Sequence, residues 1–172
     1  MSDLANIAVS IDMYASRCVG EGYSVLGFSA GPGQGWRFIK PDMFTLVYIE
    51  PPVDDGIGAV EIVGAGARGL SQHRAVFRYI ATHAVLNTYG SMFGSVRADE
   101  LVLTGIRLRV PLSIIDVNNK DVMGFLYSMV PLLGSIGHQD AKKLIERHGG
   151  RLLDGANDDD AVELYRASNG RA

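Results

Sequence analysis

The stretch from Val60 to Val110 constrains the fold more than any other part of this chain. Its pattern predicts a strand, a glycine-rich turn, a helix and then a hairpin, over Ala59–Val63, Gly64–Gly69, Ser71–Tyr89, and Arg97–Leu103 with Ile106–Leu112. The helix is apolar nearly all round, which indicates burial against a sheet on one side and a second subunit on the other. A sheet of hairpin-connected strands with helices packed on it is typical of α+β domains.

The three glycines of the turn, Gly64, Gly66 and Gly69, have the G-x-G-x-x-G spacing of a dinucleotide-binding fingerprint. In that fingerprint the backbone amides at a helix N-terminus approach a pyrophosphate, and an acidic residue about 20 positions later holds the ribose. Here that offset falls on Tyr89 and Gly90, and an antiparallel hairpin follows the helix. We therefore expect the glycines to form a tight turn that lays a helix across a sheet. A small nucleotide-handling enzyme that uses this turn is the alternative.

A helix is predicted near the N-terminus, because apolar residues recur there with a period close to that of a helix. The apolar stripe consists of Leu4, Ile7, Ala8, Ile11, Tyr14, Ala15 and Cys18. The stripe can cover a sheet, or it can form a surface that captures a partner. The sequence alone leaves both possibilities open.

Three strands are predicted next, over Tyr23–Ala30, Trp36–Lys40 and Met43–Glu50. The third is apolar on both of its faces, which indicates a central strand that is covered on both sides. The first ends in Gly27-Phe28-Ser29-Ala30-Gly31, a match to the G-x-S-x-G motif that presents a nucleophilic serine between a strand and a helix. The loop Gly31–Gly35 cannot begin a helix, so ester chemistry at Ser29 is kept only as an alternative.

A last helical region is predicted to begin near Asn118 or Asn119, with a kink or a new segment at Pro131, because proline breaks the hydrogen bonding of a helix interior. Gly134 and Gly137 are expected to loosen it, and the helix resumes over Asp140–His148. Residues 154–172 are acidic and rich in small residues, and we expect a flexible tail with at most one turn of helix over Ala161–Arg166. One α+β domain is therefore expected over residues 1–153. Its predicted order is α-β-β-β-(β)-α-β-β-α, a twisted antiparallel sheet packed by helices on one face.

Composition and charge exclude several classes of function. The chain is 47% hydrophobic and 20% charged, with no apolar run long enough for a membrane span and no segment that resembles a secretory signal. Acidic residues exceed basic ones only in residues 154–172, so the folded part lacks the basic surface typical of nucleic-acid-binding proteins. The single Cys18 cannot form an internal disulfide, and no histidine pair has the spacing of a metal site. We expect a cytoplasmic protein without metal or cofactor.

Residues Glu61–Gly150 resemble the YbjN-like proteins and the wider group of type III secretion chaperone-like domains. The resemblance rests on the helix segment Ala75-Val76-Phe77-Arg78-Tyr79-Ile80, on the hairpin segments Glu100-Leu101-Val102-Leu103 and Leu108-Arg109-Val110-Pro111-Leu112, and on a terminal helix that carries Asp140 and ends at His148-Gly149-Gly150. The order of the predicted elements also fits this group. The chain departs from it in its Gly64–Gly69 turn and its Gly31–Gly35 loop.

The resemblance implies a homodimer without catalytic residues that holds an extended segment of a partner protein. We therefore predict a non-enzymatic protein-binding or chaperone-like module; a subunit of a larger complex would show the same sequence features. The predicted contact residues, chosen as apolar residues near sheet edges and loops, are Leu4, Ile7, Ile11, Tyr14, Phe28, Trp36 and Phe38. The predicted dimer interface, on the central helix and the hairpin, consists of Val76, Phe77, Ile80, Arg107 and Arg109.

Overall fold

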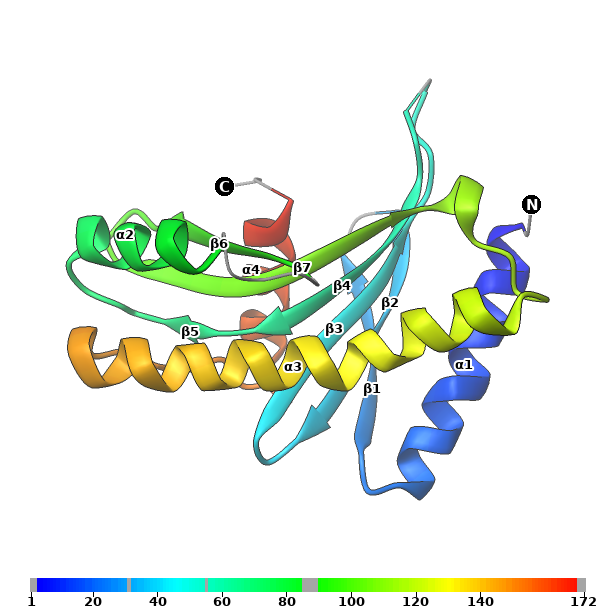
Figure 1. Cartoon of the computed structure of the whole chain (residues 1–172), viewed down its shortest axis with the longest axis horizontal. Coiled ribbons are helices and arrows are strands. Elements are labelled where there is room, and N and C mark those ends of the chain that lie inside the picture. The colour runs from blue at the N-terminus through cyan, green and yellow to red at the C-terminus, as the bar shows by residue number, and fades with distance from the viewer. Residues whose placement is uncertain (1–2, 31, 55, 85–89, 170–172) are drawn as a thin grey trace.

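A six-stranded antiparallel sheet is the centre of the fold (Figure 1). The computed structural model of the chain describes residues 3–30, 32–54, 56–84 and 90–169. The strands of this sheet, in spatial order, are β1 (Ser24–Ala30), β2 (Gly33–Lys40), β3 (Met43–Glu50), β4 (Ala59–Ala65), β7 (Val102–Pro111) and β6 (Ser91–Val96). The helices are α1 (Leu4–Gly20), α2 (His73–Ala84), the 3₁₀ turn η1 (Leu112–Ile114), α3 (Lys120–His148) and α4 (Asp158–Ser168). A small second sheet pairs β5 (Ala67–Arg68) with β8 (Arg151–Leu152). The predicted α+β class with an antiparallel sheet is confirmed.

Helices cover both faces of the sheet. On one face α3 runs along the sheet, with α1 and α2 beside it (Figure 1). The buried side chains of this face include Phe38 and Val47. On the other face α4 lies over Leu46 and Val63. Strand β3 supplies apolar residues to both faces, and all of them are buried, so a helix layer on each side is needed to exclude water. The expectation of helices on one face only is therefore wrong.

The C-terminal residues form a packed helix where a flexible tail was expected. The side chain of Asn157 accepts a hydrogen bond from the Asp160 amide at 3.1 Å, which caps the N-terminus of α4. Three acidic residues occupy the first turn, where they interact favourably with the positive end of the helix dipole. Ala161 and Leu164 are fully buried against the sheet. The acidic run is thus the start of a helix, and the prediction of a flexible tail over residues 154–172 is wrong for the part of it that the structure describes.

Two glycines bring the backbone of α3 into contact with β4. A Cβ built on Gly64 would lie 2.0 Å from the carbonyl oxygen of Leu133, and one built on Gly137 would lie 2.6 Å from that of Ala65. Carbon and oxygen atoms do not approach so closely, so only glycine fits at these positions. Gly64 does help to lay a helix across the sheet, as the sequence indicated. The helix, however, is α3, and not α2, which directly follows the turn.

Pro131 lies inside α3, which runs without interruption from Lys120 to His148. Because proline has no N–H, the carbonyl of Tyr127, four residues earlier, lacks its usual partner within the helix. The hydroxyl of Tyr14 in α1 donates to this carbonyl at 3.1 Å. Burial raises the pKa of Tyr14 above its ordinary value, which keeps the donor proton in place. Helix α1 thus supplies the hydrogen-bond donor that the Tyr127 carbonyl lacks within α3. The predicted break into a new segment does not occur.

The hairpin lies earlier in the chain than predicted. Its strands are β6 and β7, and residues 97–101, predicted as strand, form the connection between them. In this connection the Arg97 amide donates to the carbonyl of Leu101 at 2.8 Å, and Glu100 has a φ of +64°. The helix predicted over Ser71–Tyr89 is α2, and the last part of that prediction, residues 85–89, lies outside the described residues.

Candidate functional site

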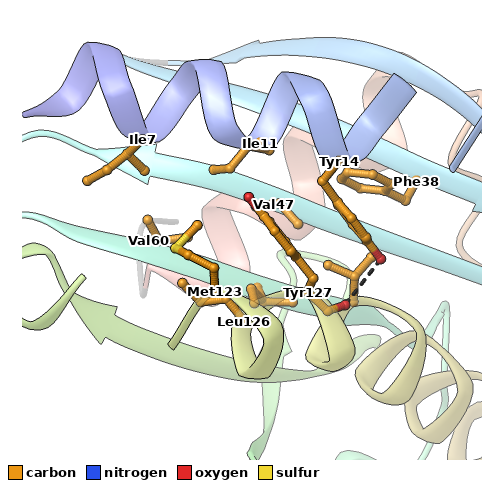
Figure 2. A pocket seen from close by; sticks show the side chains of 11 residues that line it. Ile7, Ile11, Tyr14, Phe38, Val47, Val60, Met123, Leu126 and Tyr127 are labelled. Carbon is orange, nitrogen blue, oxygen red and sulfur yellow. Dashed lines mark hydrogen bonds between the residues drawn. The ribbon is translucent and has the colours of Figure 1, made fainter. Parts of the chain in front are cut away.

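The apolar stripe of α1 belongs to the core. Ile7 is only 1% exposed, and Figure 2 shows that it points with Ile11 and Tyr14 towards the sheet and α3. The side chains that meet there leave a cavity of only about 10 Å³, and they come from Ile7, Ile11, Tyr14, Phe38, Val47, Val60, Ile62, Met123, Leu126, Tyr127 and Val130. The prediction that Ile7, Ile11 and Phe38 contact a partner is therefore wrong, because folding already buries them. Leu4 stays exposed and Tyr14 is half-buried.

Replacing Ile7 and Ile11 together with aspartate is expected to unfold the chain, because each carboxylate would be buried without a partner. Circular dichroism measures this effect. At 25 °C the variant should give the spectrum of an unfolded chain, and heating it should show no cooperative transition. The matched control is Val9→Asp with Met13→Asp on the same helix, whose side chains are 56% and 68% exposed. The control should keep the transition. A folded Ile7/Ile11 variant would show that the stripe is not core.

The predicted interface residues on α2 are also engaged within the chain. Val76 is fully buried, Ile80 is nearly so, and Phe77 is half-buried. The helix lies directly on β6, where a Cβ built on Gly94 would be 2.8 Å from Ile80 Cδ1. Val76 and Ile80 therefore cannot form an interface with a second subunit, and the predicted interface is wrong for them. Dimerisation itself stays a prediction.

The two predicted interface arginines lie in a polar cluster under α4. Arg109 Nη1 pairs with the buried carboxylate of Glu61 at 3.0 Å. Arg107 donates to the carbonyl of Ser168 at the end of α4. The hydroxyl of Tyr48 donates to Glu61, and burial, followed by the charge of Glu61, raises the pKa of Tyr48 above its ordinary value. The bond from Arg107 to Ser168 helps to hold α4 on the sheet, so Arg107 is already engaged within the chain. Arg109 pairs only with strand and loop residues, its side chain is 45% exposed, and its place in a dimer interface stays a prediction.

The glycine turn has few amides left for a ligand. The amides of Gly66 and Leu70 each donate to a carbonyl of β7 at 3.1 Å, and the Ser71 amide donates to the last carbonyl of α3 at 3.0 Å. A nucleotide cradle needs such amides to point at phosphate. The alternative cofactor site at Gly64, Gly66 and Gly69 therefore lacks the donor geometry that it requires.

An open groove of about 700 Å³ lies between α1 and the free edge of the sheet. Strand β1 forms this edge, since within the described residues it pairs only with β2. The groove is lined from α1 by Asp12, Ala15, Ser16 and Val19, from β1 by Val25, Gly27, Phe28 and Ser29, and from β2 by Gln34, Gly35 and Trp36. Two predicted contact residues, Phe28 and Trp36, thus border a surface that is open to a ligand, although both side chains are themselves largely buried.

Gly27 leaves the floor of this groove bare. It pairs with Trp36 in the sheet and therefore faces α1, as do Val25 and Ser29, two positions away on either side. A Cβ built on Gly27 would meet no atom within 4 Å. Glycine weakens a strand and often marks a place where a ligand or another backbone approaches closely. Packing within the chain does not require this glycine, whereas the approach of another chain would explain it.

Ser29 does not lie on a nucleophile elbow. It lies in β1 opposite Gln34, and the chain returns through a hairpin into β2. The elbow requires a sharp turn from a strand into a helix, with a histidine within reach of the serine. Among the described residues that line the groove there is no histidine. The alternative of ester chemistry at Ser29 therefore lacks both the turn and the base.

Asp12 occupies the α1 side of the groove. The indole Nε1 of Trp36 donates to Asp12 Oδ1 at 2.7 Å, which fixes the carboxylate near the rung that Trp36 forms with Gly27. Arg17 of the same helix does not neutralise it, because its guanidinium lies over the Tyr14 ring at 5.7 Å instead. Sequence reasoning missed Asp12 and Gly27 as a pair. Their only signals, a polar residue beside an apolar stripe and a glycine inside a strand, occur in most domains of this size.

Comparisons with known proteins assign no family to this chain: no family model matches it, and no match is found among the curated proteins. Among the helices in the described part of the chain, none combines the length and the apolar composition that a membrane span requires.

Proposed function

We propose that this protein is a non-enzymatic protein-binding or chaperone-like module that holds an extended segment of a partner protein along β1. The observation that carries the proposal is the open groove beside a free sheet edge, with a bare floor at Gly27. A segment that adds to a sheet edge binds through main-chain hydrogen bonds, and its alternate side chains enter the neighbouring pockets. The side chains on one face of such a segment would point into the groove.

The composition of β1 supports the same proposal. Proteins normally protect a sheet edge with charged residues, proline or a very short strand, because a bare edge pairs with other chains. Strand β1 has seven residues, SVLGFSA, without a charge or a proline. Next to it Val19 of α1 is 56% exposed, and Leu26 on the other face of β1 is 37% exposed. Arg37 of β2 donates to the Gly27 carbonyl at 3.1 and 3.0 Å, so an added strand would pair with the other main-chain groups of β1. Apolar surface on both sides of this edge favours such a strand.

The resemblance to the YbjN-like and type III secretion chaperone-like proteins favours the same kind of role. We extend the proposal to the cytoplasmic location and the homodimer that the resemblance implies. A dimer would use surfaces other than the buried side of α2.

A peptide selection tests the proposed function. Peptides of eight residues, selected from a random display library for binding to the protein, should lose at least about tenfold in affinity for the variant Gly27→Phe, because the ring would fill the groove. The matched control is Gly124→Phe on α3, where a built Cβ also meets no atom within 4 Å. The control should bind as the wild type does. Equal binding by the Gly27 variant would place the binding surface elsewhere.

A further inference from the structure

We infer that the groove selects a segment with a lysine or arginine whose side chain crosses Gly27 and pairs with Asp12. The inference rests on the proposed function and specifies the chemistry of the partner segment. It follows from the positions of Asp12 and Gly27 relative to the sheet edge, and from the charges around the groove.

Distance favours a long side chain. Neighbouring strands lie about 4.8 Å apart, so a strand added to β1 lies roughly 10 Å from β2, which carries Trp36. The carboxylate of Asp12 is held by the indole of Trp36, the residue that pairs with Gly27 across the edge. At the position of Trp36, strand β1 contributes Gly27, which has no side chain to block the approach from the edge. A lysine or arginine side chain is long enough to span the gap, whereas a serine or valine side chain is not.

The surroundings of Asp12 favour a cation. Among the described residues that line the groove, Asp12 is the only one with an ionisable side chain that carries charge at neutral pH. Its Oδ1 accepts from the Trp36 indole, and within the described part of the chain no ion pair neutralises the carboxylate. Asp12 is exposed, so a basic residue of the partner can pair with it at the surface, whereas an acidic residue in the same place would be repelled.

The part of the groove next to Gly27 can accommodate the methylene chain of a lysine or arginine side chain. Val25 and Ser29 flank Gly27 on the same face of β1, and Ala15 and Ser16 lie across the groove on α1. Small and apolar walls can accommodate the methylene groups of the side chain while the charged end reaches Asp12. An apolar segment without a basic residue could bind in the same groove. The experiment below distinguishes a segment with a basic residue from a segment without one.

Selection of octapeptides on the wild type and on Asp12→Asn tests the inference. Asparagine keeps an oxygen that can accept from Trp36 Nε1 and removes only the charge. On the wild type, lysine or arginine should be enriched at one peptide position, and replacing it with norleucine should weaken binding about fivefold, as for a solvent-accessible ion pair. On Asp12→Asn both the enrichment and the fivefold difference should disappear, and on the control Asp42→Asn, in the turn between β2 and β3, both should remain.

Two outcomes would overturn the inference, and they differ in what they say of the proposed function. If peptides bind in a manner that depends on Gly27 but show no basic position, or keep it on Asp12→Asn, the pairing with Asp12 is wrong and the strand-addition groove stands. If no selected peptide is sensitive to Gly27→Phe, both the groove and the pairing are wrong.

Discussion

The variant Gly64→Ala is expected to be less stable than the wild type by about 3 kcal/mol, at the upper end of the usual cost of an overpacked core. The added methyl group would lie 2.0 Å from the carbonyl oxygen of Leu133 and 2.4 Å from its carbonyl carbon. Both atoms belong to the backbone of α3, so no side-chain rotation can relieve the clash. The helix must move away from β4, and the core between them must loosen. Urea denaturation measures the effect as a lower midpoint at constant slope.

Gly27→Ala is the matched control, because it also replaces a strand glycine with alanine. Its new methyl group meets no atom within 4 Å, so this variant should be as stable as the wild type or slightly more stable. Gly137→Ala touches the same seam, since its methyl group would lie 2.6 Å from the Ala65 carbonyl. Once one clash has displaced α3, the second costs less, so the double variant should lose less stability than the sum of the single variants. If the losses of stability in the two single variants are additive, the two glycines do not belong to one contact between α3 and β4.

The second large effect is expected at Asp160, which anchors α4. Its buried carboxylate accepts from Arg151 Nη1 at 2.7 Å, from Arg68 Nη1 at 2.6 Å and from the Asp154 amide at 2.8 Å. Arg68 and Arg151 are paired residues of β5 and β8, so the carboxylate separates two neighbouring positive charges. Asp160→Ala should cost roughly 2–4 kcal/mol, somewhat less than a fully buried ion pair, because both arginines are partly exposed.

This cluster also predicts a dependence of stability on pH. Burial by itself would raise the pKa of Asp160, but hydrogen bonds from Arg151, the Asp154 amide and Arg68 outweigh it, and the net pKa lies below the ordinary value of 3.8. A carboxyl whose pKa is lower in the folded state stabilises the fold above its unfolded pKa, and this stabilisation disappears as the pH falls through the folded pKa. The free energy of unfolding of the wild type should therefore fall below about pH 4 by more than that of Asp160→Asn. Parallel pH profiles would show that the carboxylate is not engaged.

The sequence predicts the sheet well, because each strand there has a strong local pattern. Apolar residues on both faces of Met43–Glu50 predict that β3 is a covered, central strand, and the structure agrees. The predicted hairpin is shifted because the prediction extends the aliphatic run Leu101-Val102-Leu103, which leads into β7, backwards into the polar residues before it. Only the pairing of β6 with β7 shows that residues 97–101 connect the two strands.

The roles of single residues depend on contacts that no local pattern contains. Gly64 and Gly137 are 73 positions apart and meet only because α3 crosses β4. The α1 stripe is core because α3 closes over it, with Tyr127 and Tyr14 stacked at a centroid distance of 4.3 Å. Asn157 followed by three acidic residues is a typical start of a helix and could have predicted α4. The low hydrophobicity of the segment favoured a prediction of disorder instead.

Amide hydrogen exchange along β1, measured with and without a selected peptide, tests whether a partner segment adds to this edge of the sheet. If the segment adds to the sheet edge, amides within Ser24–Ala30 should exchange more slowly in the complex, because an added strand protects them. Strand β6 (Ser91–Val96), the other edge of the sheet, is the internal control and should not change. A peptide that binds tightly while β1 exchanges at its free rate, or that protects β6 instead, would rule out strand addition at β1.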